Sequence, residues 1–200
     1  SMKDYKKAKS NLYSALNKMK TVKSDSLLNR INQSLFKNHM LTESDSSFFY
    51  LQKVNHYYKN IGDDLSYYIL YSNNFNYYIA QNNPKLAKIS IDSCVYYAKK
   101  SKEKDRILLA LGNLVYNQVQ IEKNYKKGKE TYLEIFRISD KDTLSTRFAE
   151  HSYSYGNVLQ SLGEYKEANK FLRRAVEIKD YLYKQNISNA VHDIETKYKI

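Results

Sequence analysis

The chain has 200 residues, of which 42% are hydrophobic, so it is long and apolar enough to bury a core. A single Pro and five Gly leave little of the turn chemistry that a many-stranded sheet needs, and the lone cysteine, Cys94, excludes an internal disulfide or a cysteine metal cage. The net charge of +12 is spread from Lys3 to Lys199 and interleaved with acids, which indicates solvated helix surfaces more than a concentrated nucleic-acid site.

The apolar spacing predicts helices along the whole chain. We expect a first helix over about 4–21, which looks like the second half of a repeat, and a last helix from about 186. Between them we expect four helix pairs, at 25–40 with 43–59, 63–81 with 84–100, 104–122 with 124–139, and 143–161 with 164–183. Asp25, Thr42, Asp63 and Asp142 are expected N-caps, and Pro84 fits the first turn of its helix.

A small residue recurs in the second helix of each expected pair. It stands at Ala8, Ser47, Ala87, Gly128 and Ala168, at intervals of 39, 40, 41 and 40 residues. Apolar residues follow four and seven positions later, as at Ile91 and Cys94 after Ala87, which places all three on one helix face. A small side chain at this position lets two helices approach closely, so we expect these positions to be buried where helices cross.

The last repeat carries the most specific motif. It reads Tyr155-Gly156-Asn157-Val158-Leu159, then Leu162-Gly163-Glu164-Tyr165, then Ala168, Leu172 and Ala175. This resembles the tetratricopeptide (TPR) pattern, with a helix-packing glycine at Gly156 that Gly112 matches in the preceding repeat. The interval of about 40 is longer than the 34 residues of the commonest TPR unit.

The resemblance implies an all-α, TPR-like helical-hairpin solenoid, a right-handed superhelix of about nine to ten helices. The repeat array would occupy residues 1–185, in units at about 1–21 (a half repeat), 25–59, 63–100, 104–139 and 143–183. Residues 186–200 would form a C-terminal helix leading to an output region outside the sequence.

No set of residues in the sequence predicts catalysis. The histidines His39, His56, His151 and His192 lie far apart and make no metal-binding motif, and Cys94 occupies a repeat core position. No phosphate loop or nucleophile motif is present. We expect no enzyme activity in these residues, no cofactor and no metal.

The resemblance implies a protein or peptide ligand on the concave face that the first helices of TPR repeats line. Asn113 and Asn157 follow the two packing glycines, where an amide side chain can hold the backbone of a ligand. The family's groove positions fall on Arg106, Leu109, Asn113, Tyr116, Asn117, Glu150, Tyr153, Asn157, Gln160 and Ser161, and in the repeat before these on Tyr68, Ser72 and Phe75. The alternative is that these residues form a solvated inner face.

The C-terminal segment from Ile187, which ends Asp193-Ile194-Glu195-Thr196-Lys197-Tyr198-Lys199, resembles a charged helix of Bacteroidetes sensor proteins. In those proteins the helix follows TPR repeats and precedes a membrane span and a histidine kinase or a DNA-binding output domain. The resemblance implies a periplasmic sensory input domain of a two-component or similar signal-transduction system, with a homodimer through this helix. No apolar run in the 200 residues reaches the ~18 needed for a span, so membrane attachment would lie outside them.

Two other functions stay open at this point. One is a free-standing cytoplasmic TPR scaffold or peptide-responsive regulator. The weaker one is a helical repeat that binds nucleic acid through the net charge of +12, a partner that we do not expect because the charge is dispersed.

Overall fold

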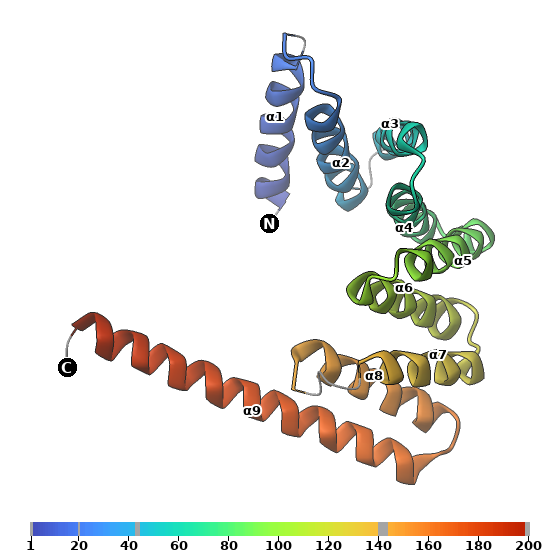
Figure 1. The fold of residues 1–200 in the computed structure, drawn as a ribbon, viewed down its shortest axis with the longest axis vertical. Coiled ribbons are helices and arrows are strands. Elements are labelled where there is room, and N and C mark those ends of the chain that lie inside the picture. Colours follow the sequence, from blue (N-terminus) through green and yellow to red (C-terminus); the bar gives the residue numbers. More distant parts are fainter. Residues whose placement is uncertain (1, 20, 43–44, 140–143, 199–200) are drawn as a thin grey trace. The chain divides into compact units, whose positions relative to one another are not determined.

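A computed structural model of the chain describes residues 2–19, 21–42, 45–139 and 144–198. Over these residues it contains helices and no strands, in the order α1 Met2–Lys18, α2 Asp25–Leu41, α3 Ser46–Ile61, α4 Asp64–Ala80, α5 Pro84–Ser101, α6 Lys104–Tyr116, a π-helical segment η1 Asn117–Ile121, α7 Tyr125–Ile138, α8 Thr146–Ser161 and α9 Tyr165–Tyr198 (Figure 1). The predicted all-α repeat fold is confirmed. The chain divides into two compact units, Ser1–Ala110 and Leu111–Ile200.

Polar side chains begin several of the helices. Asp63 Oδ1 accepts a hydrogen bond from Ser66 N at 2.7 Å, as predicted, and Asn83 caps α5 ahead of Pro84 in its first turn. Two predicted caps were wrong. Ser24, not Asp25, caps α2, because its hydroxyl accepts from Leu27 N. Thr42 ends α2 and does not begin α3, and Asp142 lies outside the described residues.

In unit 1 (Ser1–Ala110) α1 packs on α2, α2 on α3, α3 on α4 and α4 on α5 (Figure 1). The core between α1, α2 and α3 includes Leu35, Phe36 and Leu51, and the α3 to α5 part buries Val54 and Ile91. Of the repeated small residues in this unit, Ser47 and Ala87 are buried as expected. Ala8 is exposed, since no described helix precedes α1 and covers it.

In unit 2 (Leu111–Ile200) η1 packs on α7, α7 on α8, and α8 along the first part of α9. Tyr132, Phe136, Tyr155 and Phe171 form an aromatic cluster between the three helices, with ring centroids 4.7 to 6.2 Å apart. Gly128 and Ala168 are buried as predicted. At Gly156 a Cβ atom would lie 2.7 Å from Leu172 Cγ, so α8 and α9 touch along the small residues of the repeat.

Two helices differ from the sequence prediction. The break expected between 183 and 186 is absent, because no Gly or Pro follows Gly163 and α9 runs unbroken for 34 residues. The helix expected over 104–122 changes to π geometry at Asn117, where Glu122 N donates to the carbonyl five residues earlier.

The described helices do not include one that is both long and apolar enough to span a bilayer. In the same part of the chain no three His, Cys, Asp or Glu side chains gather as a metal ion would require.

Candidate functional site

A groove between α6 and α8 in unit 2 gathers part of the predicted ligand-binding face. We call it the α6–α8 groove; it has a volume of ≈ 460 Å³. It is lined by Gly112, Val115, Tyr116, Val119, Gln120, Tyr125, Tyr132, Glu150, His151, Ser154, Asn157, Val158 and Ser161. A volume of this size lies in the range of ligand sites.

The helix spacing explains which α8 residues face the groove. Glu150, Ser154, Asn157 and Ser161 follow one another at intervals of four, three and four residues, so they form one stripe along α8. On the opposite wall Tyr116, at the end of α6, is 46% exposed and offers a ring with a hydroxyl tip. Gly112 leaves room between the walls, because even an added Cβ would lie 3.7 Å from His151 Cε1.

His151 supplies a polar atom in this wall that has no partner in the structure. Its Nε2 atom is buried and makes no hydrogen bond, and its ring meets Tyr132 edge-on at 6.1 Å. Burial, and to a smaller extent Arg147, lowers the pKa of His151 from its ordinary value of 6.5. The imidazole is therefore neutral at pH 7, and Nε2 can accept or donate a hydrogen bond according to its tautomer.

Four of the predicted face residues lie in the groove and four others of unit 2 do not. Tyr116, Glu150, Asn157 and Ser161 line it. Asn113 and Gln160 lie outside its wall, and Tyr153 lies on another side of α8, where Lys179 Nζ of α9 sits 5.7 Å from its ring centroid.

The prediction for Asn117 was wrong, because its side chain is fully buried. Asn117 Nδ2 donates to Glu122 Oε1 at 2.7 Å and so closes the π-helical segment η1 on itself. Asn117 therefore faces inward instead of toward a ligand.

The remaining predicted positions belong to unit 1. Phe75 is in the core at 3% exposure, which contradicts its assignment to a binding face. Ser72 is half-buried and its hydroxyl lies by the Cys94 thiol. Tyr68 is half-buried, and burial raises the pKa of its phenol, against a smaller lowering by Arg106. Leu109 is 51% exposed. Cys94 is buried as predicted, and burial raises its pKa to about 12.

Sequence reasoning missed several groove residues. Ser154 could have been found from the α8 stripe, since it lies four residues after Glu150. His151 and Tyr132 carried no such signal, because a lone histidine or tyrosine at helical spacing is more often a packing residue.

Solved structures with TPR-like repeats are similar to this fold. A crystal structure of a variant of a putative kinesin light chain of Podosopora anserina, described as nearly identical TPR-like repeats, has a TM-score of 0.70 at 14% identity, over 90% of this chain and 89% of that one. A second crystal structure of those repeats has a TM-score of 0.68, also at 14% identity, over 89% and 88% of the two chains. These likenesses show the fold as a TPR-like helical repeat. No protein-family model matches the chain, and no curated protein matches it.

Proposed function

We propose that this chain is a protein-binding TPR-like domain, and that the α6–α8 groove takes a short extended segment of another polypeptide. The observation that carries the proposal is the groove wall, where exposed Asn157 and the unpartnered Nε2 of His151 stand beside apolar Val115 and Val158. An extended peptide presents backbone N–H and C=O groups that such side chains can pair with, while its side chains cover the apolar wall.

The chemistry of the groove favours a polypeptide over a nucleic acid. Glu150 is the charged residue in the wall, and a carboxylate repels phosphate. Tyr116 and Tyr125 offer aromatic contact area with polar tips, the property that makes tyrosine frequent at protein-binding hot spots. Stacked helical repeats in general present extended surfaces of this kind to their ligands.

A selection of random peptides on the immobilised chain tests the proposal. We expect the selected peptides to share a sequence motif. Tyr116→Ala removes an aromatic anchor and should lower the affinity for these peptides by about tenfold. Asn157→Ala removes one hydrogen bond and should lower it by about three- to tenfold. Asn169→Ala, which alters an exposed asparagine on α9, is the matched control and should bind as the wild type does. Selected peptides that bind all three variants equally would place the ligand elsewhere.

We propose further that the domain is the sensory input region of a bacterial signal-transduction protein, located in the periplasm. Two observations support this: the C-terminal segment resembles the charged helix of sensor proteins, and α9, which contains that segment, contacts α8. The same α8 that lines the groove touches α9 through Tyr153 and Lys179, so a ligand on α8 acts on the helix that leads to residue 198. Signalling of this kind needs two states that differ in ligand affinity.

The parent gene distinguishes this proposal from a cytoplasmic scaffold. A signal peptide ahead of these residues and an apolar span of ~20 residues after them, followed by a kinase or DNA-binding region, would support the sensor. A reading frame with neither would leave the scaffold. Steep loss of RNA or DNA affinity with added salt would instead support nucleic-acid binding.

A further inference from the structure

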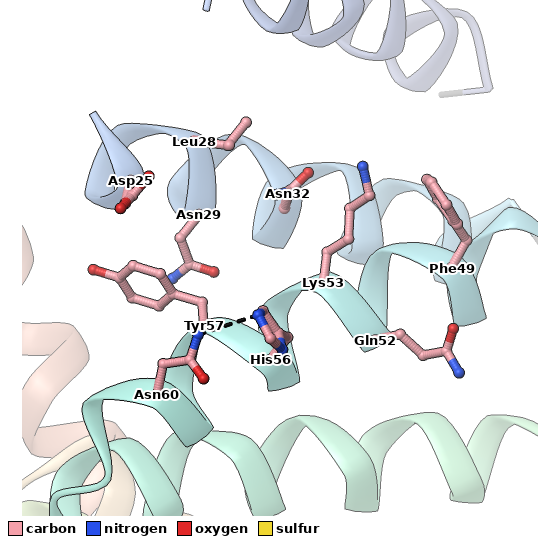
Figure 2. Close-up of a pocket in the computed structure, with 10 residues that line it drawn as sticks. All are labelled: Asp25, Leu28, Asn29, Asn32, Phe49, Gln52, Lys53, His56, Tyr57 and Asn60. Carbon is pink, nitrogen blue, oxygen red and sulfur yellow. Dashed lines mark hydrogen bonds between the residues drawn. The ribbon is translucent and has the colours of Figure 1, made fainter. Parts of the chain in front are cut away.

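A pocket between α2 and α3 in unit 1 is lined by two buried asparagines whose Oδ1 atoms have no hydrogen-bond partner. The pocket has a volume of ≈ 480 Å³, and Asn29 and Asn32 of α2 line it together with Phe49 and Tyr57 of α3. Figure 2 shows the side chain of Asn29 pointing from α2 toward α3. None of these residues belongs to the α6–α8 groove, so the inference does not depend on the function proposed above.

The two asparagines are buried and each has an unpaired side-chain oxygen, a property that Asn38, Asn55 and Asn117 share without lining this pocket. Asn29 is 4% exposed and Asn32 is 6% exposed, and the Oδ1 atom of each has no hydrogen-bond partner. Buried polar atoms in proteins are nearly always paired, because leaving them unpaired is costly. The asparagines stand three residues apart and so share one face of α2.

The rest of the wall defines what could pair with these oxygens. Leu28, Phe49 and Tyr57 are apolar over most of their surface, and the charged residues Asp25 and Lys53 are exposed, with Lys53 Nζ 4.5 Å from the Phe49 ring centroid. Gln52, His56 and Asn60 of α3 also line the pocket; all three are exposed, and Asn60 Nδ2 and His56 Nε2 hydrogen-bond to each other at 3.1 Å. The pocket therefore combines apolar surface and exposed polar side chains with two buried, unpaired oxygens, and it has no buried charge. The complementary molecule is uncharged and apolar, and it donates hydrogen bonds.

We propose that this pocket is a binding site for a small neutral molecule that carries N–H donors on an apolar, ring-sized body. Ordered water is the rival occupant, since water also pairs with buried oxygens. One water takes about 30 Å³ in the liquid, far less than this pocket offers. Pockets of this size that mix apolar walls with a few polar atoms are typical of small-molecule sites.

Matched probes with and without the donor test the proposal on the wild-type chain. Indole is compared with 1-methylindole, and benzamide with N,N-dimethylbenzamide, by titration into the ¹⁵N-labelled 200-residue protein. We expect indole and benzamide to shift the side-chain NH₂ signals of Asn29 and Asn32 saturably, and to bind at least tenfold more tightly than their methylated forms. Failure of both donor probes to saturate would overturn the proposal and leave water as the occupant. Equal binding of the methylated forms would overturn the role of the donors.

Two variants separate ligand binding from folding. Asn29→Leu and Asn32→Leu remove the unpaired oxygens at nearly constant size, so we expect Tm to hold or rise while the affinity for indole and benzamide falls at least tenfold. Asn76→Leu, at an exposed position of α4, is the matched control and should leave the affinity unchanged. Leucine variants that bind the donor probes as tightly as the wild type would refute the assignment. Should a leucine variant fail to fold, the probe pairs still decide the question.

Discussion

Two glycines at equivalent repeat positions have opposite relations to their surroundings. A Cβ at Gly156 would lie 2.7 Å and 2.8 Å from Leu172 atoms and 3.3 Å from the Ala168 carbonyl oxygen. A Cβ at Gly112 would meet His151 Cε1 at 3.7 Å, which is ordinary contact. The sequence pattern treats both as helix-packing glycines, but only Gly156 is required by close approach.

We therefore expect Gly156→Ala and Gly112→Ala to change the free energy of unfolding in opposite directions. Overpacking at Gly156 should cost about 1–3 kcal/mol. Removing a glycine from the interior of α6 should add about 0.5–1 kcal/mol. Urea unfolding followed by circular dichroism measures both. Equal effects of the two substitutions would contradict the packing difference.

Burial of His151 makes the stability of the chain depend on pH. Its pKa is lowered in the folded state, chiefly by burial, and the unfolded chain takes up a proton near 6.5. Because the folded pKa is the lower one, the stabilisation is present above about pH 6.5 and is lost as the pH falls toward the folded value. His39 acts in the same direction, through burial and Lys9.

Unfolding free energies at pH 7.5 and 5.5 test this for His151. We expect the wild type to lose stability between the two, and His151→Gln to lose less, because the variant no longer binds that proton on unfolding. His192→Gln, which replaces an exposed histidine on α9, is the matched control. An unchanged pH dependence in His151→Gln would mean that this histidine is not held neutral by the fold.

At the scale of elements, α9 has two parts with different environments. Ala168, Ala175 and Ile178 are buried, whereas every described residue from Tyr183 onward is exposed. The outer part still carries a stripe of exposed apolar side chains, at Tyr183, Ile187, Val191, Ile194 and Tyr198. This stripe is where the predicted homodimer through the C-terminal helix would form.

Truncation distinguishes the two parts. A chain that ends at Tyr183 should keep the Tm of the full chain within about 2 °C, since no buried contact is lost, while one that ends at Leu172 loses Ala175 and Ile178 and should be destabilised by several kcal/mol. Light scattering on the same samples reports the oligomeric state. If the full chain is a dimer and the chain that ends at Tyr183 is a monomer, the predicted pairing is supported. If both chains are monomers, it is contradicted.

Most helices were predictable because the repeat supplies redundant signals. The buried small residues Ser47, Ala87 and Ala168 recur with apolar neighbours four and seven residues later, and turn residues such as Asp63 and Pro84 mark the boundaries. The unbroken α9 was missed because the repeat length suggested an end near 183 where the chain contains no helix breaker. The π segment has no simple sequence signature.

At the scale of the whole molecule, left-handed residues end many of the helices. Gly62 and Gly163 adopt φ of 72° and 78°, and Asn82, a residue type that tolerates this region, adopts 50°. Lys102 and Lys123 adopt φ of 57° and 54° with side chains that disfavour it. We expect Lys102→Gly and Lys123→Gly each to raise the free energy of unfolding by up to about 1 kcal/mol. Glycine removes the cost of a left-handed lysine in the folded chain, and its greater conformational entropy in the unfolded chain offsets part of that gain. Lys99→Gly, inside α5, should lower it and serves as the control in the same thermal melts.

The candidate sites were less predictable than the fold. Helix spacing identifies which residues share a face, as for Glu150, Asn157 and Ser161, but the neighbour that covers a face follows from packing. Phe75 and Asn117, predicted on the binding face, are therefore buried in the structure. The pocket beside Asn29 and Asn32 was not predicted. Polar residues on a helix usually indicate a face exposed to solvent, so the spacing of polar and apolar residues does not reveal a buried asparagine.

The exposed part of α9 also has a mechanical consequence. From Lys184 to Tyr198 the helix extends for about 22 Å at 1.5 Å per residue, and all of its described residues there are exposed. A tilt of about 5° where α9 leaves α8 would displace its far end by about 2 Å, a distance comparable to the helix shifts that switch proteins use. A small rotation where α9 packs on α8 would therefore become a larger displacement at the far end of the helix.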